Sequence, residues 1–339
     1  MTGKGFLKRF GTWISLGFPQ GAFRETRGCG PFGKQEVVCG FWGQCPKVFV
    51  LRTGGDHMEK WPIGVFTSID AGLGVKLEVA HELGIPTIQL HAPRPETRTA
   101  DNAKRFLDRL GELGITLTAV FGGFEGESYA DIPTVARTVG LVPPATRTER
   151  TREMKEIADF ARVLGCDIVA LHLGFIPHDR HAPLYRDVVK VTQEICDHCA
   201  KNNQRLHLET GQESADTLLQ FIQDVERPNL FVNFDPANMI LYGSGEPIAA
   251  LRKVGSYVRS VHCKDAKWAA RPGEEWGEEV PLGQGDVNIE LFLRTLAELG
   301  YDGALTIERE IPHEPERQKR EIGYAVGLLT ELKKKILGS

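Results

Sequence analysis

The chain has 339 residues, of which 41% are hydrophobic and 25% charged, a composition typical of a globular protein with one large core or two smaller ones. Its net charge of −4 gives no electrostatic case for a nucleic-acid partner, because such proteins usually carry a basic face. No run approaches the roughly 18 apolar residues that a membrane-spanning helix needs, so we expect no membrane partner.

The cysteines form an odd-numbered set without a repeated metal-binding pattern. Only Cys196 and Cys199 have C-x-x-C spacing, and they lie on a stretch that we expect to be helical. A single pair of this kind is more often core packing than a zinc site. A reducing, cytoplasmic setting fits best. The complete set is Cys29, Cys39, Cys45, Cys166, Cys196, Cys199 and Cys263.

Residues 1–57 differ from the rest of the chain. They are rich in glycine and aromatic residues, as in "GTWISLGFPQGAF", and show neither helical nor strand periodicity. We expect an irregular, poorly ordered extension over 1–57 and a folded domain over 58–339. Regular organisation begins just after Met58, so an over-extended start of translation is an open alternative.

From Met58 onward, apolar and β-branched runs of strand length alternate with amphipathic stretches of helical length. Helices are expected at "GVKLEVAHELG", "NAKRFLDRLGELG", "REMKEIADFARVLG" and "LFLRTLAELG", each ending in the glycine that often terminates a helix. The expected strands are 63–69, 87–93, 116–124, 168–174, 205–210, 230–238, 258–266 and 304–310.

This alternation predicts an α/β fold, a (β/α)₈ TIM barrel. Near-continuous apolar strands indicate burial on both faces, and intervening helices indicate parallel pairing. Eight such units fit a barrel of about 250 residues. A doubly wound open sheet is the alternative, but the glycine-rich dinucleotide turn is missing after the first strand.

In such a barrel the active site lies at the carboxyl ends of the strands. Glu209, Asp235, His262 and Glu308 end four consecutive strands, so three carboxylates and an imidazole would converge. Carboxylates held this close repel each other unless a proton or cation neutralises them. We therefore expect one divalent metal ion, Mn²⁺ first, with Mg²⁺, Co²⁺ or Zn²⁺ as alternatives. A single residue of this kind would more often be a helix cap.

Five motifs carry a family resemblance: "LHLETGQE", "VNFDPANM", "SVHCKDA", "PLGQGDVN" and "LTIERE". Together they resemble the xylose-isomerase-like superfamily of sugar isomerases and epimerases, over about residues 61–335. This superfamily includes the tagatose 3-epimerase, hydroxypyruvate isomerase and inosose-processing families. The resemblance implies that Glu209, Asp235, His262 and Glu308 bind one divalent metal and that Glu209 and Glu308 are the catalytic acid/base pair. It also implies a homo-oligomer as a frequent state.

The residues agree with that chemistry, because abstracting a proton beside a carbonyl requires a placed base and stabilisation of the enediolate. We expect a metal-dependent isomerase or epimerase acting on a small carbohydrate or keto-polyol. A lyase or dehydratase on a keto-inositol or 3-keto-glycoside could use the same site, and a barrel without catalysis stays an alternative. An endonuclease IV-type nuclease is disfavoured, because Asn238 stands where those enzymes need a histidine.

The remaining polar and aromatic residues near the strand ends are candidates for contacts with substrate. Lys264 could neutralise an enediolate or bind an anionic group, and its alternative is a salt bridge to Asp265 or another neighbour. A lone histidine is as often a core residue, and an aromatic residue is more often core. The substrate-binding candidates are His91, His172, Gln212, Asn238, Lys264 and Trp268.

Overall fold

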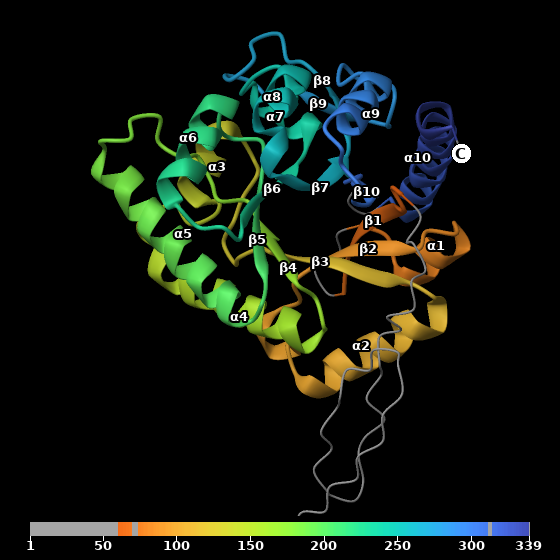
Figure 1. Cartoon of the computed structure of the whole chain (residues 1–339), viewed down its shortest axis with the longest axis horizontal. Coiled ribbons are helices and arrows are strands. Elements are labelled where there is room, and N and C mark those ends of the chain that lie inside the picture. The colour runs from red at the N-terminus through yellow and green to blue at the C-terminus, as the bar shows by residue number, and fades with distance from the viewer. Residues whose placement is uncertain (1–59, 70–73, 311–313, 339) are drawn as a thin grey trace, which may run out of the picture. The chain divides into compact units, whose positions relative to one another are not determined.

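The computed structural model describes residues 60–69, 74–310 and 314–338. Within them, eight parallel strands close into a barrel in the order β1-β10-β7-β6-β5-β4-β3-β2 (Figure 1), which confirms the predicted TIM barrel. The barrel strands are β1 (Ile63–Ser68), β2 (Thr87–His91), β3 (Thr116–Gly122), β4 (Ile168–Leu171), β5 (Arg205–Glu209), β6 (Leu230–Phe234), β7 (Val258–Cys263) and β10 (Leu305–Ile307). The expectation for residues 1–57 lies outside the described residues.

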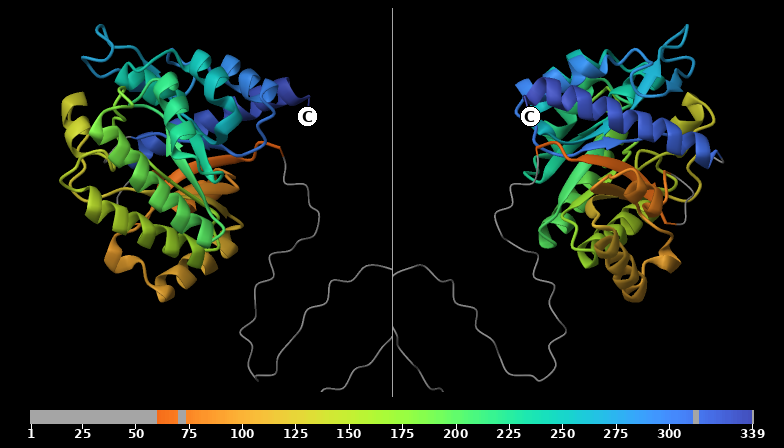
Figure 2. Two further views of the ribbon diagram at one scale, coloured as in Figure 1. Left: turned by 60° about the vertical axis from the view of Figure 1, so that its left-hand side comes forward. Right: turned by 90° about the vertical axis from the view of Figure 1, so that its right-hand side faces the viewer.

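The helices lie outside the strands, as two further views make clear (Figure 2). They are α1 (Leu77–Glu82), α2 (Ala100–Leu113), α3 (Ile132–Thr138), α4 (Arg147–Val163), α5 (Pro183–Lys201), α6 (Ala215–Val225), α7 (Pro236–Tyr242), α8 (Pro247–Val254), α9 (Ile289–Glu298) and α10 (Pro315–Leu337). Short 3₁₀ turns occupy Pro95–Thr97 and Gly255–Tyr257. Among the helices of the described segments, none has the length and apolar character to cross a bilayer.

Local sequence explains where these helices begin and end. The Thr99 hydroxyl accepts a hydrogen bond from the Asn102 N–H and starts α2, while Gly114, at φ 67°, ends it. Ser214 caps α6 in the same way through the Thr217 N–H. The predicted helical stretches therefore lie on α1, α2, α4 and α9, with small differences at their ends.

All eight predicted strands run past the observed strand ends, and for two of them the sequence gives an identifiable reason. The run 230–238 ends as a strand at Phe234, because Asp235 caps α7 and Pro236 occupies the first helical position. The run 258–266 is divided after Cys263. Its last residues open β8 (Asp265–Lys267), which pairs antiparallel with β9 (Glu278–Val280) in a small separate sheet.

The main hydrophobic core fills the space between strands and helices. Its largest fully buried side chains include Phe221, Phe234 and Phe292, and the last two rings stack with centroids 6.2 Å apart. Cys196 and Cys199 are both completely buried in this core as free thiols, which confirms the packing interpretation of their spacing.

Inside the barrel, the strand faces that lead to the predicted ligands are polar. Each of these side chains is buried and stands two residues before a strand-end residue, so it shares that residue's face of the strand. Such positions in TIM barrels are usually occupied by branched apolar residues. Burial lowers the pKa of His207 to about 3, so this imidazole stays neutral at neutral pH. The polar set is Gln89, His207, Asn233, Ser260 and Thr306.

Candidate functional site

Four side chains meet at the carboxyl ends of β5, β6, β7 and β10. One ligand atom from each of Glu209, Asp235, His262 and Glu308 lies within 4.8 Å of the others, and all four residues are buried. They come from neighbouring strands of the closed barrel, so the parallel register alone brings them together. This buried group could hold one metal ion.

The imidazole of His262 is oriented by a partner on each ring nitrogen. Its Nε2 lies 2.7 Å from Gln89 Oε1, and because an amide oxygen only accepts, Nε2 carries the hydrogen. Its Nδ1 lies 2.8 Å from Glu209 Oε1, 3.1 Å from Glu308 Oε2 and 3.5 Å from Asp235 Oδ2. A histidine that donates one N–H to a fixed acceptor and turns the other nitrogen toward carboxylates has the arrangement of a metal ligand.

Electrostatics explain why a cation fits this group. Burial alone would lower the pKa of His262, but the Glu308 and Glu209 carboxylates raise it well above its ordinary value. Burial raises the pKa of Asp235 to about 6. Its Oδ1 accepts the Asn238 N–H at 2.9 Å, whereas Oδ2 has no hydrogen-bond partner among the described residues. Asp235 is therefore both the cap of α7 and an oxygen donor with a free lone pair. An O₃N set of this kind suits Mn²⁺ or Mg²⁺.

Lys264 and Asn238 form the next layer of contacts. Lys264 Nζ lies 3.1 Å from Glu308 Oε2, 3.5 Å from Asn238 Oδ1 and 3.8 Å from Glu279 Oε2. Asn238 Nδ2 donates to Glu209 Oε1 at 3.2 Å. Burial alone would raise the pKa of Glu308, but Lys264 and His262 hold it well below its usual range. The structure thus pairs Lys264 with Glu308 and Glu279.

Asp265 has a different role, because it organises a loop. Its carboxylate accepts backbone N–H groups from Gly283 at 2.9 Å, Gly285 at 3.0 Å and Val287 at 3.2 Å. A side chain at Gly285 would collide with this carboxylate, since a Cβ there would lie 2.2 Å from Oδ1. The "PLGQGDV" segment is therefore held against the start of β8 by one buried side chain.

On the other side of the site, Gln212 and His172 lie in a row that leads to Glu209. Gln212 Nε2 lies 3.3 Å from His172 Nδ1 and 3.2 Å from Tyr242 Oη. Because the amide donates to Nδ1, His172 carries its hydrogen on Nε2, which lies 3.1 Å from Glu209 Oε2. His172 lines the pocket, whereas Gln212 is buried behind it.

A pocket of about 450 Å³ opens above these residues. His91, His172, Asn238 and Lys264 all line it, and Gly123 leaves room for His91, since a Cβ there would lie 2.4 Å from the imidazole Nε2. The complete lining is Phe66, His91, Phe121, Gly122, Gly123, Glu127, Tyr129, His172, Glu209, Asn238, Leu241, Tyr242, Lys264, Trp276, Gly277, Glu279, Glu308 and Glu310.

Trp268 lies elsewhere. Its half-buried ring packs against the main core, and its backbone N–H donates to Asp286 at 3.0 Å. The tryptophan that lines the pocket is Trp276, whose ring centroid is 4.6 Å from that of Tyr242. The difference arises because β8 and β9 form a hairpin, which places the later tryptophan over the mouth.

Sequence reasoning also missed Gln89, Glu279 and Tyr129. Gln89 had a detectable signal: it is a polar residue inside the apolar run "TIQLH", two residues before His91 and therefore on the same strand face. Glu279 and Tyr129 come from a short hairpin strand and a loop, whose positions over the mouth are set by tertiary contacts.

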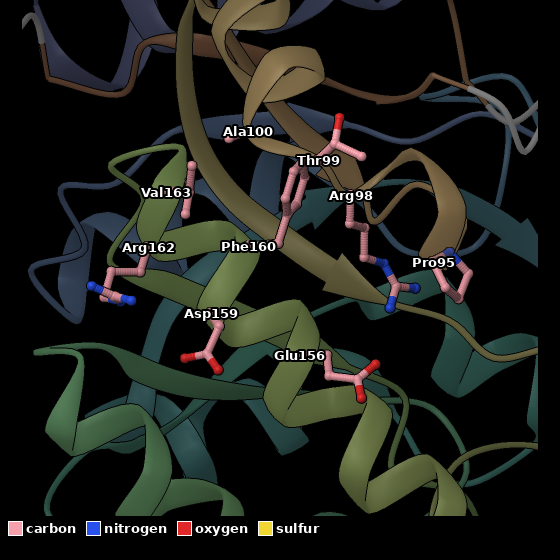
Figure 3. A pocket seen from close by; sticks show the side chains of 9 residues that line it. All are labelled: Pro95, Arg98, Thr99, Ala100, Glu156, Asp159, Phe160, Arg162 and Val163. Atoms are coloured by element: carbon pink, nitrogen blue, oxygen red, sulfur yellow. The ribbon is translucent and has the colours of Figure 1, made fainter. Parts of the chain in front are cut away.

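A second hollow, of about 410 Å³, lies between the start of α2 and the face of α4 (Figure 3). It contains none of the ligand group. Its charged side chains have other partners: Arg98 donates to Glu153 at 2.7 Å, and Asp159 accepts from Asn202 at 2.8 Å. The barrel mouth is therefore the better candidate for chemistry.

Comparisons with known proteins agree with this assignment of fold. A family model described as "Xylose isomerase-like TIM barrel" matches residues 77–328. A crystal structure of a xylose isomerase domain protein from Planctomyces limnophilus is 60% identical, with a TM-score of 0.81, and the match covers 83% of this chain and 100% of that one.

More distant matches include one protein compared by structure and one compared by sequence. D-psicose 3-epimerase from Clostridium cellulolyticum H10, solved with D-tagatose, is 16% identical with a TM-score of 0.60, covering 80% of this chain and 99% of that one. The uncharacterized protein MJ1311 of Methanocaldococcus jannaschii is 24% identical over 183 residues, and the match spans 49% of this chain and only 60% of that relative. The extent of the family match decides the classification: the chain belongs to the xylose isomerase-like TIM barrel family.

Proposed function

We propose that the protein is a divalent-metal-dependent isomerase or epimerase that moves a proton next to a carbonyl group of a sugar or keto-polyol. The proposal rests on where Glu209 and Glu308 lie. Both belong to the buried ligand group, and both line the pocket that would receive a substrate. Epimerases among the structural neighbours support the same class at the level of fold.

Glu308 is placed to act as one of the two acid/base groups. Its Oε2 takes the contacts to His262 and Lys264, while no described residue donates to its Oε1. That second oxygen is available to accept a proton from a substrate carbon, and Lys264 keeps the carboxylate ionised beforehand.

Glu209 is the second acid/base group, and its surroundings differ. Its Oε1 accepts from Asn238 and faces His262, and its Oε2 lies 3.1 Å from His172 Nε2. A proton at Oε2 could therefore pass between the carboxylate and an imidazole that lines the pocket. Return of the proton to the opposite face of the same carbon gives epimerisation, and return to the neighbouring carbon gives isomerisation.

Glu209, Asp235, His262 and Glu308 would hold the metal ion, which when bound supplies Lewis-acid stabilisation of the negative charge that develops on the substrate oxygens. Lys264 adds a second positive charge on the Glu308 side of the pocket.

The test is hydrogen exchange in D₂O. The protein, loaded with Mn²⁺, Mg²⁺ or Co²⁺, is incubated with ketoses, keto-inositols and 3-keto-glycosides, and NMR identifies the carbon that gains deuterium. We expect deuterium next to the carbonyl with every C–O bond retained. Loss of water or of an aglycone would assign the same site to a lyase or dehydratase. No exchange on any substrate, with metal bound, would refute the proposal.

A further inference from the structure

Carboxylates dominate the charged groups that line the pocket. The described lining residues include five glutamates, Glu127, Glu209, Glu279, Glu308 and Glu310, and a single lysine, Lys264, with no arginine. Asp235 lies beneath them as a sixth carboxylate. Even with a divalent ion and Lys264 counted, negative charge remains in excess, so the potential inside the pocket disfavours anions.

The one ammonium group is already engaged. Lys264 Nζ contacts Glu308 and Glu279, and it is nearly completely buried. Phosphate and carboxylate groups are usually bound by arginine forks or several free backbone N–H groups. At the start of α7, Pro236 has no N–H, and the Asn238 N–H is already met by Asp235 Oδ1.

The nearby arginines do not supply the missing donors either. Arg309 Nη1 lies 2.5 Å from Glu279 Oε1 and its Nε lies 2.6 Å from Glu321 Oε2. Arg150 lies 3.9 Å from Glu127 and donates to backbone carbonyls. Both guanidinium groups stabilise carboxylates from behind, and neither lines the pocket.

The pocket lining also contains apolar and aromatic side chains. Tyr242 and Trp276 pack together, and Tyr129 lies edge-on to His172 with ring centroids 6.2 Å apart. Phe66 and Phe121 form a T-shaped pair with centroids 5.4 Å apart, on the barrel strands. Such rings provide flat apolar surface for the C–H faces of a carbohydrate, while the carboxylates accept from its hydroxyl groups.

We propose that the pocket selects uncharged carbohydrates and rejects substrates that carry a phosphate or carboxylate group. The inference rests on the proposed function and names its substrate class. Each hydroxyl is a donor that the carboxylates can bind, whereas an anionic group would lie among like charges, with no arginine in the described lining and with Lys264 already paired to Glu308 and Glu279. An anion placed beside like charges should bind roughly 100-fold or more weakly than the matching uncharged carbohydrate.

Two measurements on the metal-loaded protein test the inference. The first compares deuterium incorporation into free ketoses, such as D-fructose and D-tagatose, with incorporation into their terminal phosphates. The second measures by calorimetry the binding of D-glucitol and of D-glucitol 6-phosphate, which need not react. We expect the uncharged member of each pair to be preferred by about 100-fold or more. Equal or tighter binding of the phosphorylated member, or no binding of either polyol, would overturn the inference.

A charge reversal at Glu310 tests whether the pocket carboxylates set this preference. Glu310→Lys replaces a pocket carboxylate with an ammonium group and should reduce the discrimination at least tenfold. Glu314→Lys makes the same change at an exposed residue outside the pocket lining and should leave the discrimination as in the parent. Equal effects of both variants would show that net charge, and not the pocket, sets the preference. Absence of exchange on every ketose, with the glucitol preference intact, would instead refute only the proposed reaction.

Discussion

Replacing Gln89 with leucine should weaken metal binding without removing a ligand. Gln89 Oε1 accepts the Nε2–H of His262 at 2.7 Å, and both residues are buried, so leucine fills similar space but leaves that N–H without an acceptor. An unpartnered buried donor costs about 1–3 kcal/mol. Loss of such a partner of a metal ligand usually lowers affinity about 10- to 100-fold, which corresponds to roughly the same range of free energy.

The assay is a titration, monitored by calorimetry, in which the protein and a chelator compete for Mn²⁺. Melting curves are also recorded with and without metal. Gln89→Glu keeps an acceptor for the imidazole and should retain the affinity. Ser260→Ala is a matched control, because Ser260 is on the same strand as His262 but contacts His207, 2.8 Å away. If Gln89→Leu is folded and binds Mn²⁺ as tightly as the parent, the imidazole is not oriented by Gln89 and the reasoning fails.

Three further results are expected. Glu308→Gln, saturated with metal, should bind substrate yet turn over roughly 10² to 10⁴ times more slowly, because the amide cannot accept the proton. A turnover rate near that of the parent, measured by NMR, would mean that Glu308 acts only as a metal ligand. Asp235→Asn should mainly weaken metal affinity, and excess Mn²⁺ should recover part of the rate; a titration in which added metal recovers nothing would contradict this. Burial raises the pKa of Glu213 to about 8, from an ordinary value of 4.5, so its contribution to stability is complete below pH 4.5 and is lost as the pH rises to 8. Glu213→Gln should therefore gain stability relative to the parent between pH 4.5 and 8, by at most about 5 kcal/mol, and urea unfolding that shows a pH-independent difference would contradict the assignment.

The barrel was predictable because apolar, β-branched runs of strand length alternate with amphipathic stretches of helical length, and the structure has a barrel strand within each of the eight expected runs. The convergence of Glu209, Asp235, His262 and Glu308 followed from the same reasoning, since parallel strands bring their carboxyl ends together. The end of β6 could also have been read from the sequence: Asp235 followed by Pro236 is a cap followed by a favoured first helical residue.

The walls of the pocket were harder to predict. Trp268 and Trp276 are equally plausible in the sequence, and only the hairpin of β8 and β9 decides which one reaches the mouth. The positions of Tyr129 and Glu279 depend in the same way on loop conformations, which the periodicity of the sequence does not predict. Gln89 was visible as a polar residue inside an apolar run, but its role appears only when its partner His262, 173 residues away, is seen beside it.

The anchoring of one loop by Asp265 has a consequence for how specificity could be altered. The hairpin that carries Trp276 and Glu279 is joined to the barrel at β7 and fastened by hydrogen bonds from Gly283, Gly285 and Val287 to that carboxylate. Residues 268–277 therefore form a loop whose two ends are fixed by β8 and β9, and Glu279 with its contacts to Lys264 and Arg309 lies outside it. A library confined to this loop would vary the shape offered to a substrate while the side chains on β5, β6, β7 and β10 stay unchanged.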